Sequence, residues 1–266
     1  MQIGKLGSGA TAISNPVADR VTVRGFNLAS DLIGNCGFTD YFYLLTTGRR
    51  PTPQQAFFLD ACLVAIAEHG LTPTNIAARM TLAADPASLQ GAVAAGILGC
   101  GTVVLGTASL AFAMIENIVA DAGAGGDLAA AARRFAELRR AERVTLPGFG
   151  HPLHKPADPR AARLIALAKE RGTAGRGVAI ADALGDIALQ VWNKPLPMNV
   201  SMAIAATLYD VGAPLAIVRG LPIVARAASL IAHLAEEEVN PIGFRMAAAA
   251  EGAIRYDGPE TPPLDA

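Results

Sequence analysis

One stretch of the chain limits its fold more than any other: no residue from Pro86 to Ile115 carries a charge. A segment of this length could in principle span a bilayer as a helix. Its flanks hold no cluster of lysine or arginine, so the rule that orients membrane helices has nothing to act on. Five glycines interrupt the stretch: Gly91, Gly96, Gly99, Gly101 and Gly106. Glycines at close spacing weaken an isolated helix and allow tight packing or a break. We therefore expect a buried, broken core helix and no membrane span.

The rest of the chain is rich in alanine and leucine and has no long alternation of β-branched residues, which predicts an all-α fold. Residues 27–46 and 53–70 are predicted to be helical. Thr52 precedes Pro53, as expected for an N-cap followed by proline at the first helical position. Another helix is expected to begin near Asn199. Residues 1–25 show little periodicity and could form an arm, a short hairpin or a partly ordered tail.

Composition excludes several classes of protein. With 266 residues, 52% of them apolar, the chain can bury a large core, and its net charge of −1 offers no field for nucleic acid or an anionic membrane. Cys36, Cys62 and Cys100 lie in apolar contexts without ligand-like spacing, which indicates reduced thiols and no metal site. The N-terminus lacks the apolar segment of a secretory signal. We expect a cytoplasmic protein.

Residues 146–160, LPGFGHPLHKPADPR, form the only segment where histidine, lysine and arginine converge among turn-forming residues. Its glycines and prolines indicate a shaped loop that ends where a helical pattern begins. The spacing of His151, Lys155 and Arg160 places a group able to transfer protons near two cations. This suits an anionic substrate that needs proton chemistry. The alternative is a surface turn with incidental charges.

This loop resembles the motif of the citrate synthase family, in which GFGH, three residues, a basic residue and then DPR mark the oxo-acid site. The similarity extends from about Thr39 to the C-terminus. It implies that His151 exchanges a proton with an oxygen of the oxo acid, that Arg160 holds a carboxylate and that Lys155 meets a phosphate of coenzyme A (CoA). His154 replaces a residue that is usually aromatic in the family, and it could supply acid–base chemistry.

Two other segments carry the resemblance to substrate-binding residues. His69 follows a helix in AEHGLTPTN, as does a family histidine that contacts a substrate carboxylate, with Thr72 or Thr74 as the hydroxyl residue that follows it. The alternative for His69 is a helix terminator favoured by the helix dipole. Arg226, in an apolar setting, matches the family's carboxylate-binding arginine, and a buried arginine is rare unless it is paired. Arg245 loosely matches an arginine that reaches across a dimer interface. His233 is interpreted as a helix-packing residue.

Two family catalytic residues are replaced. The histidine that stabilises the enolate of the acyl-CoA falls at about Val104 or Leu105, where only backbone N–H groups, Thr102 or Thr107 could act as an oxyanion hole. The aspartate that acts as the general base is replaced by Ser201, whose hydroxyl is too weak a base unless another group activates it. Of the three, His151 alone remains.

Residues 127–143, DLAAAARRFAELRRAER, are predicted to form a helix with clustered arginines. A solvated helix face is the favoured interpretation of these arginines, and a site for CoA phosphates is the alternative.

The resemblance implies a two-lobed helical fold, with residues 1–108 and 222–266 in a large lobe, residues 109–221 in a small one, and a homodimer. In extent the chain is similar to the short citryl-CoA lyase branch. The expected activity is a CoA-dependent carbon–carbon lyase or acyltransferase, acting on citryl-CoA or on an acyl-CoA with an oxaloacetate-like acid, with an altered catalytic set. The alternative is a non-catalytic or regulatory protein that binds a dicarboxylate or CoA. The acyl group and the direction of reaction are left open.

Overall fold

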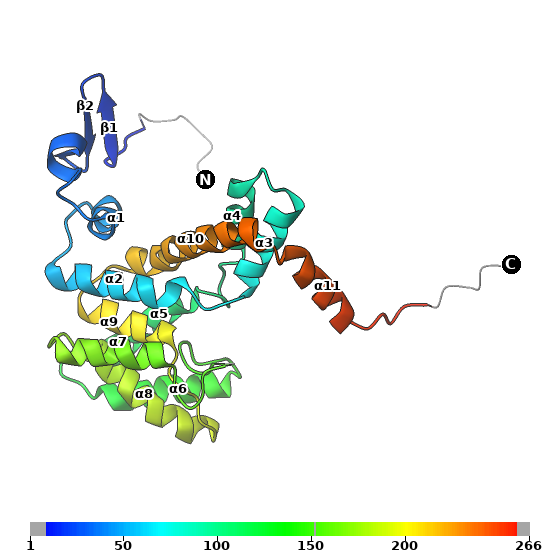
Figure 1. Ribbon diagram of the computed structural model, residues 1–266. Coiled ribbons are helices and arrows are strands. Elements are labelled where there is room, and N and C mark those ends of the chain that lie inside the picture. The colour runs from blue at the N-terminus through cyan, green and yellow to red at the C-terminus, as the bar shows by residue number, and fades with distance from the viewer. Residues whose placement is uncertain (1–8, 152, 260–266) are drawn as a thin grey trace. The chain divides into compact units, whose positions relative to one another are not determined.

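The computed structural model describes residues 9–151 and 153–259 and confirms a mostly helical fold (Figure 1). The described helices follow one another along the chain: η1 (Leu28–Leu32), α1 (Phe38–Thr47), α2 (Pro53–Ala67), α3 (Pro73–Ala84), α4 (Leu89–Leu98), α5 (Thr107–Ala122), α6 (Leu128–Ala141), α7 (Pro159–Glu170), α8 (Arg176–Trp192), α9 (Val200–Asp210), α10 (Leu215–Val239) and α11 (Gly243–Ala253).

A small antiparallel sheet precedes the helices, so the hairpin alternative holds for the N-terminal region. Its strands, in the order β1-β2-β3, are Ser14–Val17, Arg20–Val23 and Phe26–Asn27. Arg24 links the sheet to α1, because its Nε and Nη2 donate to the carbonyl oxygen of Leu45 at 3.0 and 2.7 Å. Val23 packs there with Leu32 and Leu44.

The predicted N-cap of α2 is confirmed, and it is reciprocal. The backbone N–H of Gln55 donates to Oγ1 of Thr52 at 3.2 Å, and the N–H of Thr52 donates to Oε1 of Gln55 at 3.0 Å. This is the capping-box arrangement. The side-chain amide of Gln55 also donates to the carbonyl of Val211 at 3.0 Å, which ties the start of α2 to the end of α9.

The chain divides into two compact units: the first contains the residues up to Ile66 and Leu105–Pro222, and the second Ala67–Val104 and the residues from Ile223 on. The predicted lobes, residues 1–108 with 222–266 and residues 109–221, stay a prediction. In the structure, residues up to Ile66 cluster with the middle segment rather than with the C-terminal helices. The contacts of α2 with the end of α9 explain this placement, including Cys62 Sγ and Thr207 Oγ1 at 3.8 Å.

Helix α9 forms the centre of the first unit. It packs against α5, α7 and α8 (Figure 1). Every residue from Val200 to Leu208 is buried, which is why this helix has apolar or small residues on all sides. Residues at the N-terminus of α9 are therefore held on a rigid element.

The second unit packs α3, α4, α11 and the later part of α10. Its core contains Ala78, Leu82, Ala92, Leu230 and Leu234. Gly96 is required for close packing, since a Cβ there would lie 2.6 Å from a methyl group of Leu230.

The apolar stretch is broken as predicted, because α4 ends at Leu98 and α5 begins at Thr107. The expectation of full burial was wrong. Leu98 is 86% exposed and Val103 is 88% exposed, while Ala92 and Gly96 are the buried residues of α4.

Helix α10 is the one described helix that is long and apolar enough to cross a membrane. Its most apolar 18-residue window has a mean hydropathy of 1.7, and 44% of that window is buried within the protein. A core helix of a globular protein has the same properties. Pro222 lies inside it, at the boundary between the two units.

Candidate functional site

The GFGH loop of the first unit is pressed against the residues that lead into α9. Phe149 pairs with Met198 as an isolated β-bridge, and the N–H of Gly150 donates to the carbonyl of Pro197 at 2.7 Å. Gly148 has φ +82°, and a Cβ there would lie 2.6 Å from Cβ of Met202. Only glycine allows both this conformation and this close approach.

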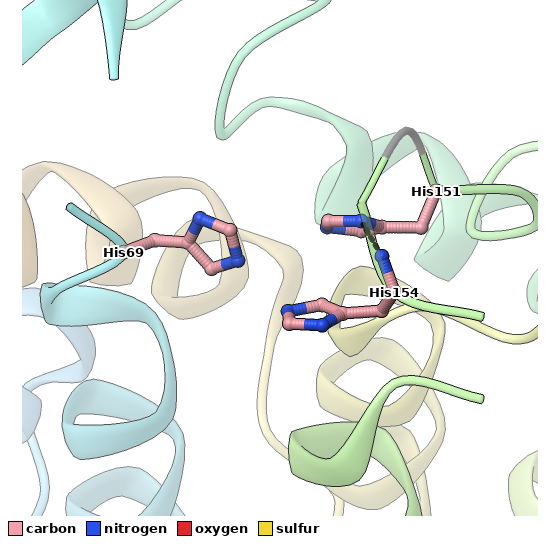
Figure 2. Close-up of side chains that lie close together, drawn as sticks. All are labelled: His69, His151 and His154. Carbon is pink, nitrogen blue, oxygen red and sulfur yellow. Dashed lines mark hydrogen bonds between the residues drawn. The ribbon is translucent and has the colours of Figure 1, made fainter. Parts of the chain in front are cut away.

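His151 at the end of this loop is held in one tautomer. Its Nδ1 accepts hydrogen bonds from the backbone N–H groups of Leu153 at 3.1 Å and His154 at 3.0 Å. A ring nitrogen that accepts cannot carry the proton, so in the neutral ring the proton lies on Nε2. The ring of His154 faces that of His151, with centroids 4.4 Å apart (Figure 2). The loop therefore presents a proton donor at Nε2.

Asn199 joins the histidine loop to Ser201. Its side-chain N–H donates to the carbonyl of Gly150 at 2.9 Å, while its Oδ1 accepts from the N–H of Ser201 at 3.0 Å and caps α9. The predicted helix start near Asn199 is confirmed. Ser201 is 9% exposed in the first turn of α9. The side chain of Asn199 therefore links the histidine loop to this first turn.

Asp158 connects the same region to α7. This buried carboxylate caps α7, pairs with Arg160 at 2.8 Å and accepts from the N–H of Val200 at 3.0 Å. Burial opposes its ionisation, but the hydrogen bonds and charge of Arg160 and the N–H of Val200 outweigh burial and lower the pKa of Asp158. Arg160 is thus held in a defined orientation, half-buried, with its charge partly offset by Asp158.

A cationic cavity of about 550 Å³ lies elsewhere in the first unit, with no carboxylate among its lining residues. The side chains that set its chemistry are Arg140, Arg143, Trp192 and Lys194. Cations around an aromatic ring suit a phosphate-bearing ligand with a planar base. The arginines of residues 127–143 were predicted to form a solvated face, with a site for CoA phosphates as the alternative; Trp192 and Lys194 come from a different segment and were not among the predicted residues. Lys155 is exposed and does not line this cavity.

The second unit contains Arg226, which is 2% exposed. Its Nη1 donates to Oδ1 of Asn75 at 2.8 Å and lies 3.5 Å from Oγ of Ser229. Its Nε is buried and has no hydrogen-bond partner among the described residues. Burial lowers the pKa of Arg226, and the charge of Glu68 acts in the opposite direction. A buried guanidinium with an unsatisfied donor suits a carboxylate ligand.

A polar network around Arg226 was missed in the sequence, and His233, which was interpreted as a helix-packing residue, belongs to it. His233 contacts Asn75 at 2.8 Å, Arg79 at 3.0 Å and Glu68 at 3.0 Å. A signal was available on α10: Arg226, Ser229, His233 and Glu237 recur at steps of three and four residues. Such polar residues share one face of an otherwise apolar helix.

The remaining predicted residues are placed as follows. His69, drawn in Figure 2, follows the end of α2 and belongs to the second unit. Its backbone N–H donates to Oε1 of Glu68 at 2.9 Å. Arg245 is exposed on α11. Leu105 presents an apolar side chain from a backbone with φ +69°.

The fold and these groups define a helical protein with a proton-bearing histidine loop and arginines suited to anions. Residues 35–246 match the family described as citrate synthase, C-terminal domain. The chain therefore belongs to the citrate synthase family, as the resemblance implied.

Relatives of this chain include both synthases and lyases. A citrate synthase from Haloferax volcanii is 30% identical over 205 residues, which cover 74% of this chain and 50% of that protein. Citryl-CoA lyase from Hydrogenobacter thermophilus has a TM-score of 0.83 at 28% identity and 97% coverage of both chains. ATP citrate lyase from Methanothrix soehngenii, solved with citrate and coenzyme A, shares the fold with a TM-score of 0.76 at 18% identity, over 97% of this chain and 43% of that one. The chain spans about half the length of the curated relatives it matches.

Proposed function

We propose that this protein is a CoA-dependent carbon–carbon lyase or acyltransferase of the citrate synthase type. Its substrate would be citryl-CoA or a related thioester, or an acyl-CoA together with an oxaloacetate-like acid. One observation carries the proposal: the GFGH loop holds His151 with its proton on Nε2, because Nδ1 accepts two backbone N–H groups. A neutral imidazole fixed in this way is suited to proton transfer at a carbonyl or hydroxyl oxygen.

In the condensation direction, Nε2–H of His151 would donate a hydrogen bond to the oxo acid's carbonyl oxygen and stabilise the alkoxide that forms with the new carbon–carbon bond, and a proton from water would complete the hydroxyl. In the cleavage direction the hydroxyl proton would pass to water while Nε2–H stabilises the alkoxide; the carbon–carbon bond breaks as the carbonyl re-forms, and its electrons pass to the thioester enolate, which is then protonated at carbon. Arg160, Arg226 and His69 would hold carboxylates. Lys155 and the cationic cavity would take the phosphates of CoA.

The test is direct. The purified protein is incubated with citryl-CoA, and separately with acetyl-CoA plus oxaloacetate, and free CoA, acetyl-CoA and oxo acid are followed by mass spectrometry. We expect cleavage of citryl-CoA that is lost in His151→Gln and kept in Arg163→Gln, a change of an exposed residue on α7. Identical rates for the wild type and His151→Gln would refute the role of His151.

The second candidate is a binding or regulatory protein that keeps the carboxylate pocket without turnover. Ser201 and Leu105 favour it, since neither side chain supplies the base or donor that the family uses. Binding of citrate in the absence of any cleavage of citryl-CoA would select this candidate.

Both candidates predict that a di- or tricarboxylate stabilises the fold through Arg226. A ligand at a hundred times its dissociation constant adds roughly 2.7 kcal/mol to the free energy of unfolding. Citrate or oxaloacetate should therefore raise the melting temperature of the wild type and of Arg163→Gln. In Arg226→Gln the rise should disappear. No rise for the wild type with either acid would argue that the pocket binds something else.

We also propose a homodimer in the cytoplasm, in which Arg245 contributes to the site of the partner chain. Arg245 is exposed on α11, so it is accessible to a second copy. Sedimentation equilibrium without detergent should give twice the chain mass of 27.3 kDa. Arg245→Ala should weaken citrate binding while the mass stays dimeric. A monomer, or recovery from membranes alone, would overturn the proposal.

A further inference from the structure

The hydroxyl of Ser229 lies between a cation and a carboxylate in the second unit. Its Oγ donates to Oε2 of Glu68 at 2.6 Å and lies 3.5 Å from Nη1 of Arg226. A hydroxyl can accept from a guanidinium while it donates to a carboxylate. Within the described residues, Glu68 and Arg226 do not form a direct ion pair. They are joined through Ser229.

Glu68 is held by several contacts in this position. Its Oε1 accepts from the backbone N–H groups of His69 and Gly70, and its Oε2 accepts from Ser229 and lies 3.0 Å from Nε2 of His233. Glu68 is therefore a positioning residue.

The contacts of His233 support this arrangement. Its Nδ1 lies 3.0 Å from Nη1 of Arg79, and its Nε2 lies 2.8 Å from Nδ2 of Asn75. The same Nε2 lies 3.0 Å from Oε2 of Glu68. Arg79 thus orients His233, and His233 helps to hold Glu68.

Glu68 is charged in this setting. Partial burial raises the pKa of its carboxyl, but the hydrogen bonds from Ser229, Gly70 and His233 outweigh burial and lower the pKa. The side chain of Glu68 is 51% exposed and Arg226 is 2% exposed, so a direct pair between them would be a charge-assisted hydrogen bond with one buried partner. It would also occupy the donors that a ligand carboxylate needs, including the Nε that has no partner.

We propose that Ser229 is a spacer that keeps Glu68 off Arg226 and thereby sets the affinity of this site for carboxylate ligands. This inference rests on the proposed role of Arg226 as a carboxylate-binding residue. Without the hydroxyl, Glu68 turns toward Arg226 and competes with the ligand.

Titration calorimetry with citrate tests the spacer. Ser229→Ala should weaken citrate binding about tenfold or more, because a charged hydrogen bond must be displaced. Ser229→Thr keeps the hydroxyl and should bind as the wild type does. The double variant Ser229→Ala/Glu68→Gln removes the competing charge and should recover most of the affinity. Unchanged affinity in Ser229→Ala, or a loss that Glu68→Gln does not recover, would overturn the proposal.

A second measurement is independent of any ligand. In ¹H–¹⁵N spectra of the ligand-free protein, the Nε–H signal of Arg226 should move downfield in Ser229→Ala as the ion pair forms, and should return in the double variant. If the wild type binds no citrate, the proposed function fails, and this signal still decides the role of Ser229. An Nε–H signal that is the same in the wild type and Ser229→Ala would exclude the spacer.

Discussion

Mixed with acetyl-CoA and oxaloacetate, the protein is expected to release CoA very slowly, and Ser201→Asp is expected to raise that rate. Condensation requires removal of a proton from the thioester's α-carbon, and the hydroxyl of Ser201 is a poor base. A general base typically contributes about 10²–10⁴ in rate. Ser201 lies in the first turn of α9, where a carboxylate is favoured by the helix dipole. Ser201→Asp should therefore fold.

The second missing group adds to this deficit. Removing one oxyanion donor costs about 10²–10³ in rate, although the losses need not multiply for residues that act together. Leu105 has φ +69°, a conformation in which histidine is more common than branched apolar residues. Leu105→His should thus be tolerated, and should increase the rate further when combined with Ser201→Asp.

Matched variants make these results interpretable. Ser201→Asn has nearly the same size as Ser201→Asp without its basicity, so it should stay slow. If His154 has taken over the proton transfer, His154→Ala should remove the residual rate. Rapid CoA release by the unmodified protein would show that the catalytic residues lie elsewhere. Hydrogen–deuterium exchange at the thioester methyl group would report enolisation directly.

The largest change in stability is expected from Arg79→Met in the second unit. Arg79 and Glu237 are both buried, and their ion pair measures 2.7 Å. Oε1 of Glu237 also accepts from the backbone N–H groups of Ile242 and Gly243 at the start of α11. Removing one partner of a buried pair leaves the other charge uncompensated, which costs about 3–5 kcal/mol. Urea unfolding at neutral pH should show this loss.

The loss of stability in Arg79→Met should depend on pH. Burial raises the pKa of Glu237, but Arg79 and the N–H groups of α11 outweigh burial and lower it below its ordinary value of 4.5. The group therefore stabilises the wild type above about pH 4.5, and that contribution is lost as pH falls through the lowered value. The deficit of Arg79→Met should shrink over the same range, because a protonated Glu237 needs no cation.

A control separates this pair from the exposed one beside it. Glu236 also contacts Arg79 at 2.7 Å, but its side chain is 59% exposed. An exposed pair contributes about 0–1 kcal/mol, so Glu236→Gln should change the urea midpoint little. Equal losses in Glu236→Gln and Arg79→Met would contradict the assignment of the stability to the buried pair.

Local rules were enough to predict several parts of this molecule. The all-α class, the cap at Thr52, the helix start at Asn199 and the break after Leu98 all depend on residues close together in the chain. The histidine loop was found because its glycines and prolines constrain the backbone directly. Burial of Arg226 was expected from its apolar neighbours on α10.

By itself, the sequence determined which residues carry protons and charges, and which turns and helices hold them. Only the tertiary structure decided how those groups are connected. Ser229, Glu68 and Arg79 come from segments far apart in the chain. Folding buries Ser229 and Arg79, and a buried polar group must find partners or remain unsatisfied. The tautomer of His151 follows from packing too, since it is set by the backbone N–H groups that the loop places beside Nδ1.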